Sequence, residues 1–319
     1  MIGTSGYIRN HHWPLLLLTA WFMAFAAYST PAMAQNGKKD VTHLFSQTGL
    51  LLGLTTEEKL YLGNKNEVTF ACDPSWAPFE FVDNEERYSG MGADYLKLIS
   101  QRIGIPFRRI PTKNWTESLK LARDGKCDVL PILNKTPERS QYLLFTSPYF
   151  TSSYVVIGKG GQWLSNGMSD MRGKTMALVR GYKMDEDIRR DFPSIKVKHV
   201  DTMEQALFMV SEGNAYATIS TTLESAHLIR KNQLKDLRVI AHTEFFNEPR
   251  MGIRKDDHIL ATIMRKAIRS ITNTEKEVIS SKWVAEDLQV ESNNPLVIRL
   301  VLVLLVCLTG VYLAYKKLR

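Results

Sequence analysis

The chain has 319 residues, of which 44% are hydrophobic and 23% charged, and its formal net charge at pH 7 is +8. This length allows about two domains, because a single hydrophobic core stops growing at roughly 250 residues. Five basic residues lie near the two ends, and without them 36 basic residues stand against 33 acidic ones, a net charge of +3. The basic character is therefore no evidence for a nucleic-acid partner.

The first 34 residues have the pattern of a secretory signal. An apolar run, residues 15–28, follows Arg9 and two histidines, and Ala32-Met33-Ala34 matches a small-x-small cleavage site. We therefore expect export of the chain and cleavage after Ala34.

Residues 35–66 are predicted to form a polar lead-in with one short helix. Thr55 and Glu58 have the spacing of a capping box, and an amphipathic stretch runs through Leu60 and Leu62. The helix is expected to precede the main domain directly.

Strand and helix patterns alternate from residue 67 onward. In the first unit, strands are predicted over 68–72, 107–110 and 129–133, and helices over 94–103 and 115–122. Strands that alternate with helices of about ten residues favour a parallel sheet covered by helices.

A second alternation follows the glycine-rich passage 158–161. Strands are predicted over 154–157, 175–179, 197–200 and 217–219, and helices over 185–191, 203–212 and 223–230. Two similar α/β units in series predict two lobes with a ligand-binding crevice between them.

The last exported elements are predicted to return to the first lobe. Strands 237–240 and 251–253 precede helices 258–271 and 274–285. Lobe 1 is expected to comprise 67–154 and 242–290, and lobe 2 to comprise 155–241. The crossing strands near 152–157 and 246–253 would then act as a hinge.

Residues 295–315 are predicted to span a membrane. The run is apolar apart from Arg299 and a few small or amphipathic residues, and it is long enough for a bilayer core of about 30 Å. The basic tail 316–319 follows at once, which by the positive-inside rule places the C-terminus in the cytoplasm and residues 35–294 outside.

Two cysteines, Cys72 and Cys127, lie in the exported region. An oxidising compartment permits a disulfide between them. However, adjacent parallel strands would hold the two sulfurs several residues apart along the strand axis. We expect two buried thiols, with a disulfide as the alternative.

Four stretches of the exported region carry a family resemblance. They are DPSWAPFEF (73–81), SGMGADYLKLISQRIG (89–104), DVLPILNKTPERSQYLLFTSPYF (128–150), and the pair RGYKMDEDIRRDFP (180–193) and EQALFMVSEGNAYATI (204–219). The region resembles the bacterial periplasmic solute-binding proteins of family 3. The resemblance implies an α/β, two-lobed periplasmic-binding-protein type II (Venus flytrap) fold, here with a C-terminal transmembrane helix.

Within that family, the segments 54–62 and 270–284 and the membrane exit look like the sensor domains of membrane-bound histidine kinases or diguanylate cyclases. The leading expectation is a membrane-anchored periplasmic sensor that closes on a small solute and passes the motion to the membrane helix. The chain ends four residues past that helix. Two interpretations are therefore open: output through a partner protein, or a truncated gene. The alternatives are a tethered receptor for ABC transport and a dehydratase-like enzyme on the same fold.

The resemblance implies that Arg139, in the TPER turn, clamps a ligand carboxylate, assisted by Asn134. A guanidinium offers a planar fork that bonds a carboxylate through two hydrogen bonds. The alternative is a solvated charge at the start of a helix.

Trp76 is expected to lie over the ligand, since a large flat ring at a cleft mouth offers apolar area for stacking. Asp73 either caps the following turn or contacts the ligand. Trp115 is interpreted as packing within its lobe.

Lobe 2 departs from the family pattern at Thr221. Amino-acid receptors of the family generally carry an Asp there to hold the ligand's ammonium group, and a hydroxyl cannot replace that counter-ion. Glu224 is a possible substitute three residues on. Tyr182, with Arg180 and Gly181, opens a helix whose backbone N–H groups could meet an anion. The expected ligand is thus a carboxylate or other small anion, with an amino acid still possible, and no cofactor or metal is expected.

Overall fold

The computed structural model describes residues 52–288 and Tyr315. The predicted secretory signal and nearly all of the predicted membrane helix lie outside these residues, so both stay predictions. Within the described part of the chain, no helix combines the length and the apolar character that crossing a membrane requires.

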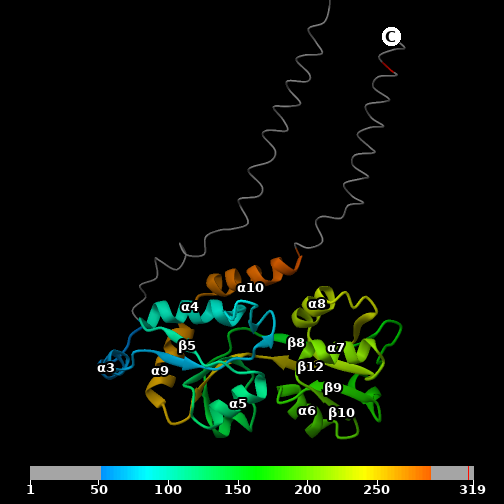
Figure 1. The fold of residues 1–319 in the computed structure, drawn as a ribbon, viewed down its shortest axis with the longest axis horizontal. Coiled ribbons are helices and arrows are strands. Elements are labelled where there is room, and N and C mark those ends of the chain that lie inside the picture. Colours follow the sequence, from blue (N-terminus) through cyan, green and yellow to red (C-terminus); the bar gives the residue numbers. More distant parts are fainter. Residues whose placement is uncertain (1–51, 289–314, 316–319) are drawn as a thin grey trace, which may run out of the picture. The chain divides into compact units, whose positions relative to one another are not determined.

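Lobe 1 is built on a five-stranded sheet with the strand order β5-β1-β6-β13-β7. Its strands are β1 (Val68–Phe70), β5 (Phe107–Arg109), β6 (Val129–Leu133), β7 (Leu143–Phe145) and β13 (Arg250–Arg254). Its helices are α3 (Thr56–Asn64), α4 (Met91–Ile103), α5 (Trp115–Arg123), α9 (His258–Arg269) and α10 (Asn273–Leu288), with the short 3-10 helix η1 (Arg139–Gln141) after β6. Figure 1 shows α4 and α10 side by side on one side of this lobe.

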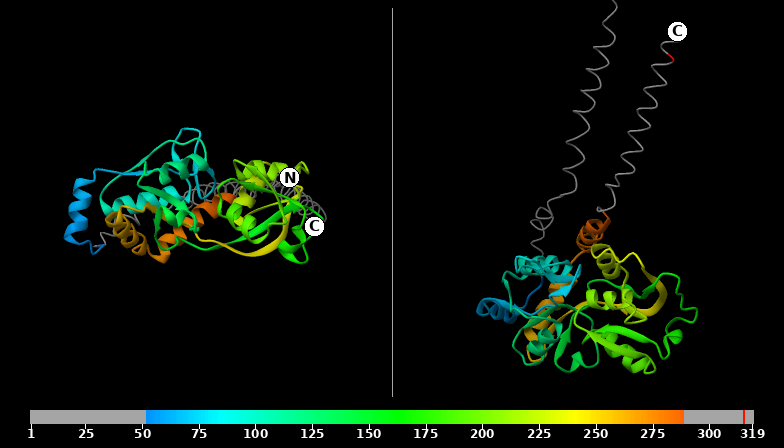
Figure 2. Two further views of the ribbon diagram at one scale, coloured as in Figure 1. Left: turned by 90° about the horizontal axis from the view of Figure 1, so that it is seen from below. Right: turned by 45° about the vertical axis from the view of Figure 1, so that its right-hand side comes forward.

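Lobe 2 has a second five-stranded sheet with the strand order β10-β9-β11-β8-β12. Its strands are β8 (Ser152–Lys159), β9 (Thr175–Val179), β10 (Lys196–Val200), β11 (Ala217–Thr221) and β12 (Leu237–Asn247). Its helices are α6 (Lys183–Asp191), α7 (Met203–Ser211) and α8 (Thr222–Lys231), with the 3-10 helix η2 (Gly167–Met171). The two views of Figure 2 show the lobes beside each other from two further directions.

The expectation of a parallel sheet in each unit holds only in part, because both sheets are mixed. β1 pairs in parallel with β5 and β6, and β9 pairs in parallel with β10 and β11, as helical crossovers require. The strands that connect the lobes run the other way: β13 is antiparallel to β6 and β7, and β8 is antiparallel to β11 and β12. Buried strands of either direction carry similar apolar runs, so the sequence pattern could not show this.

β8 and β12 form the connection between the lobes. β12 continues to Asn247, beyond its predicted end at Ile240, and its last residues pair with Ser152 and Ser153 at the start of β8. The two strands therefore leave the lobe 2 sheet together and reach the border of lobe 1 (Figure 1). Paired strands that join two lobes are suited to act as a hinge.

Each face of the lobe 2 sheet packs against its own helices. Along β9, Met176 and Leu178 belong to the cluster that includes residues of η2 and α6, whereas Ala177 and Val179 belong to the cluster with α7. This alternation is the period of two expected for a strand buried on both faces. The end of β9 therefore has a fixed direction, which positions the loop that follows it at the lobe interface.

The sequence analysis missed a small three-stranded sheet between β1 and α4. Its strands are β2 (Ser75–Trp76), β3 (Glu80–Val82) and β4 (Tyr88–Ser89), joined in the order β2-β3-β4. Strands of two or three residues are too short to show a period of two. The sheet matters because it carries Trp76 and Glu80, which are both buried.

Two local predictions have clear outcomes. The capping box of α3 is present, since Glu58 N donates to Thr55 Oγ1 at 3.2 Å and Thr55 N donates to a Glu58 oxygen at 2.7 Å. The predicted amphipathic character is weaker than expected, because Leu60 is 64% exposed. Cys72 and Cys127 are separate, buried thiols, as predicted.

Candidate ligand-binding site

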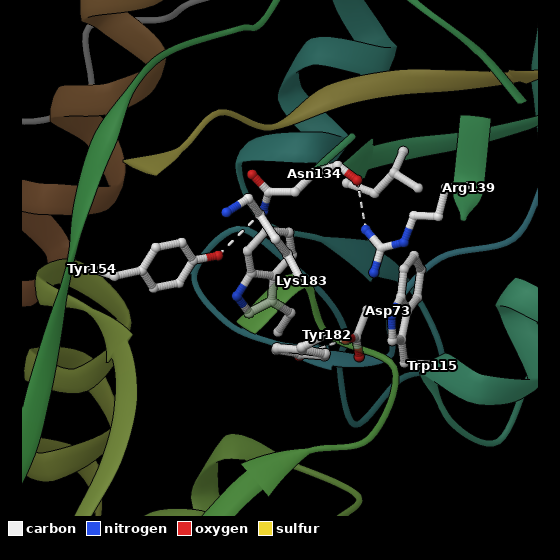
Figure 3. A pocket seen from close by; sticks show the side chains of 9 residues that line it. Asp73, Trp115, Asn134, Arg139, Tyr154, Tyr182 and Lys183 are labelled. Carbon is white, nitrogen blue, oxygen red and sulfur yellow. Dashed lines mark hydrogen bonds between the residues drawn. The ribbon is translucent and has the colours of Figure 1, made fainter. Parts of the chain in front are cut away.

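The candidate site is a cavity of about 20 Å³ between the two lobes. Its lining consists of Asp73, Trp76, Trp115, Leu133, Asn134 and Arg139 from lobe 1, and Tyr154, Tyr182 and Lys183 from lobe 2. Figure 3 shows Arg139 and Trp115 on one side of the cavity and Tyr154 on the other. This volume has room for about one water molecule, since the side chains of the two lobes meet across the cleft.

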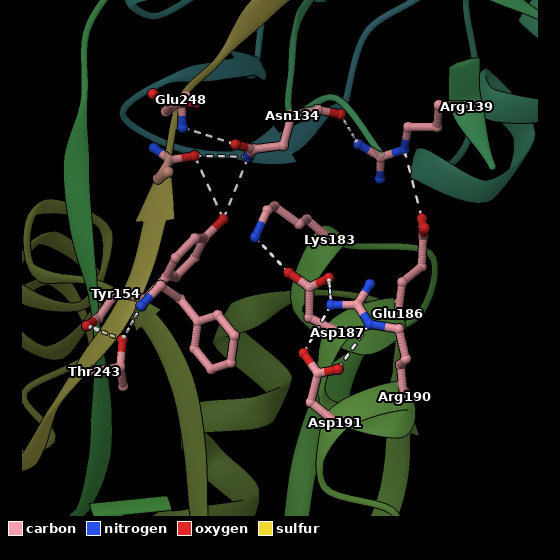
Figure 4. Close-up of polar contacts among 12 residues, drawn as sticks. Asn134, Arg139, Tyr154, Lys183, Glu186, Asp187, Arg190, Asp191, Thr243 and Glu248 are labelled. Atoms are coloured by element: carbon pink, nitrogen blue, oxygen red, sulfur yellow. Dashed lines mark hydrogen bonds and ion pairs between the residues drawn. The ribbon is translucent and has the colours of Figure 1, made fainter. Parts of the chain in front are cut away.

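Arg139 is held by backbone carbonyls of both lobes. It begins η1 and is only 3% exposed. Its Nη1 donates to Asn134 O in lobe 1 and its Nη2 donates to Gly181 O in lobe 2, each at 2.6 Å. Its Nε lies 3.8 Å from a carboxylate oxygen of Glu186 on α6 (Figure 4), and its guanidinium lies 5.5 Å from the ring centre of Trp115. Arg139 is therefore not a solvated surface charge: it joins the two lobes.

Burial and the neighbouring acid act in opposite directions on this guanidinium. Burial lowers the pKa of Arg139, and the negative charge of Glu186 partly restores it. Burial likewise raises the pKa of Glu186, and Arg139 lowers it. The two charges thus compensate each other in a site with little water.

Gly181 brings the loop after β9 against lobe 1. Its φ of 75° lies in the left-handed region that favours glycine, and a Cβ there would stand 3.2 Å from Leu119 Cδ1. Its carbonyl accepts from Arg139 and also from Trp115 Nε1 at 3.1 Å. This one carbonyl thus receives two hydrogen bonds from lobe 1.

The backbone amides of Arg180, Gly181 and Tyr182 are already bonded within the protein. Arg180 N donates to Val200 O at 2.9 Å and Tyr182 N donates to Val179 O at 3.1 Å. Gly181 N donates to a carboxylate oxygen of Asp185 at 3.2 Å. The loop satisfies its own donors, because the side chain of Asp185, in the first turn of α6, turns back to meet it.

Asp73 caps its turn, which was one of the two alternatives, and it also contacts lobe 2; contact with a ligand stays a prediction. Its Oδ1 accepts from Ser75 N at 2.9 Å, and its Oδ2 accepts from the Tyr182 hydroxyl at 2.6 Å. Burial raises the pKa of Asp73 to about 6, and the hydrogen bonds from Tyr182 and Ser75 oppose this rise.

Two buried side chains surround Asp73 on the lobe 1 side. Trp76 packs against Phe79 with ring centres 4.8 Å apart, and meets Tyr182 of lobe 2 edge-on at 6.0 Å. Glu80 accepts from Asp73 N at 2.8 Å and from the Tyr88 hydroxyl at 2.8 Å, and burial raises its pKa well above the usual range. Trp76 thus forms part of the cavity wall, while its predicted contact with a ligand stays a prediction.

Asn134 supports Arg139 through its backbone oxygen, while its side chain binds the connecting strands. Its Nδ2 donates to Asn247 Oδ1 at 2.7 Å and to the Tyr154 oxygen at 3.3 Å. Its Oδ1 accepts from Glu248 N at 2.8 Å (Figure 4). Asn134 thus holds lobe 1 to the end of β12, and its predicted assistance to a carboxylate clamp stays a prediction.

Thr221 and Glu224 both lie at the start of α8, but they do different things. Thr221 is the N-cap, and its Oγ1 accepts from Glu224 N at 3.2 Å, so its hydroxyl is used within lobe 2. Glu224 is 1% exposed, and its Oε2 accepts from Ser220 Oγ at 2.7 Å. Burial raises the pKa of Glu224 to about 7 and the charge of Asp73 adds to this rise, whereas hydrogen bonds from Ser220 and Trp76 oppose it.

Three cavity residues were missed or misassigned from the sequence. Trp115 packs in the lobe 1 core as predicted, but it also donates across the cleft. Lys183, which pairs with Asp187, lies in the stretch 180–193 but was given no role, and Tyr154 lies in none of the quoted stretches. Their positions at the start of α6 and near the start of β8 were the available signal, since crevices form at such borders between lobes. Among the described residues, no group of three or more His, Cys, Asp or Glu could hold a metal ion.

Comparison with known sequences identifies relatives among bacterial sensor proteins. The chain is similar to the virulence sensor protein BvgS of Bordetella pertussis, 25% identical over 234 residues, which cover 73% of this chain and 19% of that protein. It is also similar to the sensor protein EvgS of Escherichia coli, 23% identical over 260 residues, covering 77% of this chain and 21% of that protein. The chain therefore spans about a fifth of the length of these sensor relatives.

A transport receptor is also among the relatives. The ABC transporter arginine-binding protein 1 of Escherichia coli is 22% identical over 227 residues, covering 68% of this chain and 90% of that protein. Both kinds of relative carry the same domain, in one case as part of a sensor and in the other as nearly the whole protein.

Solved structures confirm the two-lobed type II periplasmic-binding-protein fold. The crystal structure of the BvgS VFT2 domain of Bordetella pertussis has a TM-score of 0.64 and 25% identity, covering 72% of this chain and 98% of that one. A histidine kinase sensor domain with similarity to periplasmic binding proteins also has a TM-score of 0.64, at 21% identity, covering 68% and 95%. The predicted resemblance to sensor domains of histidine kinases is thus confirmed.

The family assignment follows from a match over most of the described chain. The sequence profile of the bacterial extracellular solute-binding proteins, family 3, matches residues 68–286. This span includes both sheets, the cavity between them and nearly all of α10. The chain belongs to the bacterial extracellular solute-binding proteins of family 3.

Proposed function

We propose that this chain is a membrane-anchored periplasmic sensor domain that binds a small solute between its lobes and passes the change in lobe position to its C-terminal segment. The observation that carries this proposal is the set of hydrogen bonds across the cavity: Arg139 and Trp115 to Gly181 O, and Tyr182 to Asp73. A solute that enters must replace these bonds. Binding of the solute in the cleft is therefore coupled to the position of the lobes. The coupling is set by the difference in the solute's affinity for the closed and the parted arrangement of the lobes.

Arg139 is the proposed contact for an anionic group of the solute. Both of its Nη atoms bond carbonyls, and one of those carbonyls, Gly181 O, belongs to the opposite lobe. When the lobes part, that bond is lost and one face of the guanidinium fork becomes free for a carboxylate. Charge-assisted bonds of this type are worth roughly 1.5–3 kcal/mol. Trp76 and Trp115 would supply apolar contact beside it.

α10 is the proposed output element. Its Trp283 donates through Nε1 to Asp94 of α4 at 2.8 Å and packs edge-on against Phe81 of β3 at 6.0 Å. Phe81 follows Glu80, which accepts from the backbone of Asp73 in the cavity wall. A continuous set of packed residues thus runs from the cavity to the helix that precedes the predicted membrane segment.

A tethered transport receptor is the main alternative, and the arginine-binding relative supports it. A sensor and a receptor differ in whether solute binding changes α10. Exchange of the α10 backbone amides with deuterium, measured in the full-length chain with and without a bound solute, separates them: the sensor proposal requires a change in protection, and the receptor does not.

A dehydratase-like enzyme is a second alternative with a specific observation in its favour. Asp73 and Glu224 are buried at the cleft with pKa values of about 6 and 7, which suits groups that exchange protons near neutral pH. Turnover of prephenate or a similar cyclic acid would establish this activity, and binding without product would dismiss it.

The proposed function is tested by a thermal-shift screen of the full-length chain against carboxylates, amino acids and amines. A solute at 100 times its dissociation constant should stabilise the protein by about 2.7 kcal/mol. For a carboxylate solute, Arg139→Lys, which keeps the charge but not the planar fork, should weaken the shift, while the exposed neighbour Lys135→Ala should leave it intact. If no solute stabilises the wild-type chain, the proposal fails.

A further inference from the structure

We propose that lobe 2 carries a second binding site, separate from the cleft, and that this site takes a small organic dianion such as a short dicarboxylate. The site is a hollow of about 350 Å³. Its lining comes from the end of β8, the residues before β9, the end of α7 and the residues before β11. The inference goes beyond the proposed function, because it does not depend on what the cleft binds.

The register of the lobe 2 sheet places the hollow at the end away from the cleft. Ala217, the first residue of β11, pairs with Gly158 of β8 on one side and with Met176 of β9 on the other. Lys159, which lines the hollow, is the next residue outward on β8. Tyr154, which lines the cleft cavity, lies five residues back along β8, roughly 17 Å away at the rise of an extended strand. The hollow is therefore a separate site.

Two lysines flank the start of β11 in this hollow. Lys159 ends β8 and Lys174 precedes β9, and β11 runs between these two strands. β8 and β9 are thus two strand spacings apart, about 10 Å. Lys174 Nζ lies 3.9 Å from the ring centre of Tyr216, a contact that holds the ammonium group in place. Lys159 Nζ lies beside Gly213, where a Cβ would stand 3.8 Å from it.

Neither ammonium group has an acidic partner. Within residues 52–288, no ion pair includes Lys159 or Lys174, and the lining of the hollow contains no Asp or Glu. Three acids in the adjoining segments accept hydrogen bonds from other polar groups: Glu212 from Asn214, Asp236 from Ser211, and Asp170 from Asn166. The hollow therefore holds two positive charges that the described part of the chain does not balance.

Capping of α7 does not account for these lysines. Lysine side chains can bond the last carbonyl groups of a helix, and α7 ends at this hollow. Here backbone amides already fill those carbonyls, at 2.8–3.0 Å: Phe208 O accepts from Glu212 N, Met209 O from Asn214 N, and Val210 O from Gly213 N. The ammonium groups are therefore free for a ligand.

The rest of the lining suits an anion that has a carbon chain. Gln162 accepts from Lys159 N through Oε1, and among the described residues its Nε2 and the Thr175 hydroxyl make no hydrogen bond, so both can donate to a carboxylate. Val210 and the ring of Tyr216 give the hollow an apolar part. A short dicarboxylate can place a charge near each ammonium group and its carbon chain on that apolar part, whereas inorganic phosphate would leave the apolar part uncovered.

The test is isothermal titration of the full-length chain with two probes of equal carbon number, the dianion glutarate and the monoanion pentanoate. Glutarate should bind at least about tenfold more tightly, because it meets both ammonium groups. Lys159→Gln and Lys174→Gln should each weaken glutarate binding by about tenfold. Lys97→Gln, which removes the same charge at an exposed position of α4 in lobe 1, is the matched control and should change nothing.

Chemical acetylation locates the site in the wild-type chain. Glutarate should protect Lys159 and Lys174 from an amine-reactive acetylating reagent, as measured by mass spectrometry, and should leave Lys97 reactive. Unchanged reactivity of both lysines, or glutarate binding that survives both glutamine substitutions, would overturn the site. Pentanoate binding as tightly as glutarate would overturn the assignment of a dianion.

The outcomes separate this inference from the proposed function. If Arg139→Lys abolishes glutarate binding and the two lysine variants do not, the dianion binds in the cleft, which overturns the second site and leaves the proposed function standing. If glutarate does not bind at all, the second site is likewise overturned, and the thermal-shift screen still decides the proposed function. Neither ammonium group bonds a carbonyl or an acid of the described residues, so circular dichroism should show both variants folded like the wild type.

Discussion

The two ends of the cleft are in opposite electrostatic states. At one end Arg139 is bonded to a carbonyl of each lobe, approached by Glu186 and packed on Trp115. At the other end Asp73 and Glu224 are equally buried, yet only neutral groups bond them. The protein thus compensates its buried cation but places no cation beside these two buried acids.

This difference indicates which end holds the lobes together and which end carries an electrostatic cost. The Arg139 end makes its contacts without help, so changes there should loosen the lobes. At the acidic end, replacing the buried acids by amides should stabilise the protein at neutral pH. Opposite signs of effect at the two ends are therefore expected.

The largest expected effect is a change in how stability depends on pH. As pH rises through 3.8 and 4.5, the unfolded Asp73 and Glu224 ionise, whereas in the folded state they stay protonated up to about 6 and 7. The stability that these two acids contribute is therefore complete at low pH. It is lost as pH rises through their pKa values in the folded protein, and the loss is on the order of 3 kcal/mol for each acid. Glu80, Tyr154 and Tyr182 are the other titratable groups that face this pair.

The double variant Asp73→Asn/Glu224→Gln should lack this loss. Chemical denaturation between about pH 4 and pH 8 should show the variant gaining stability relative to the wild type as pH rises. The control Glu244→Gln should follow the wild type throughout. Parallel curves for the double variant and the wild type would show that the acids are compensated after all.

Arg139→Ala is expected to have the next largest effect, with the opposite sign. It removes both carbonyl contacts, leaves Glu186 without its cation and opens space beside Trp115, and breaking a buried ion pair costs about 3–5 kcal/mol. Denaturant unfolding measures this loss, and the exposed neighbour Lys135→Ala should cost less than about 0.5 kcal/mol. A loss for Arg139→Ala as small as that of the control would mean that this end does not hold the lobes.

Tyr182→Phe should have a smaller effect because it removes one hydrogen bond between the lobes. Asp73 loses its donor from lobe 2, at a cost of about 1.5–3 kcal/mol. Tyr88→Phe is the matched comparison, since it removes a hydroxyl bond to Glu80 within lobe 1. Deuterium exchange of residues 180–186 should rise for Tyr182→Phe only, and an equal rise in both variants would argue against a role in joining the lobes.

Trp283→Phe should have the smallest effect. It removes the bond to Asp94 but keeps an aromatic ring beside Phe81, so about 1 kcal/mol should be lost. Val284→Ala, a substitution at the exposed neighbouring position, is the control. A loss no greater than that of the control would show that α10 does not depend on this contact with lobe 1.

Much of the fold could be predicted from the sequence because long buried elements have strong patterns. The bounds of β6 and β9 match the prediction, and the capping box of α3 is where Thr55 and Glu58 indicated. The direction of β8 and β13 could not be predicted, since burial on both faces gives the same apolar run in either direction. The strands β2 to β4 were too short to have a pattern.

The candidate site was predictable where a motif marks a residue and not where the contact comes from the other lobe. Arg139 and Asp73 stand in recognisable stretches, but their partners Gly181 and Tyr182 are brought to them only by the closing of two separate domains. The sequence marked Glu224 as a candidate, but its burial without a cation depends on the packing around it and leaves no trace in the sequence.

The ionisation of Glu224 tests the account most directly. In the full-length chain with ¹³C-labelled glutamate, the Glu224 carboxyl resonance, assigned by its loss in Glu224→Gln, can be titrated. We expect a pKa near 7, because burial without a cation disfavours the charged carboxylate. A pKa near the ordinary value of 4.5 would contradict this.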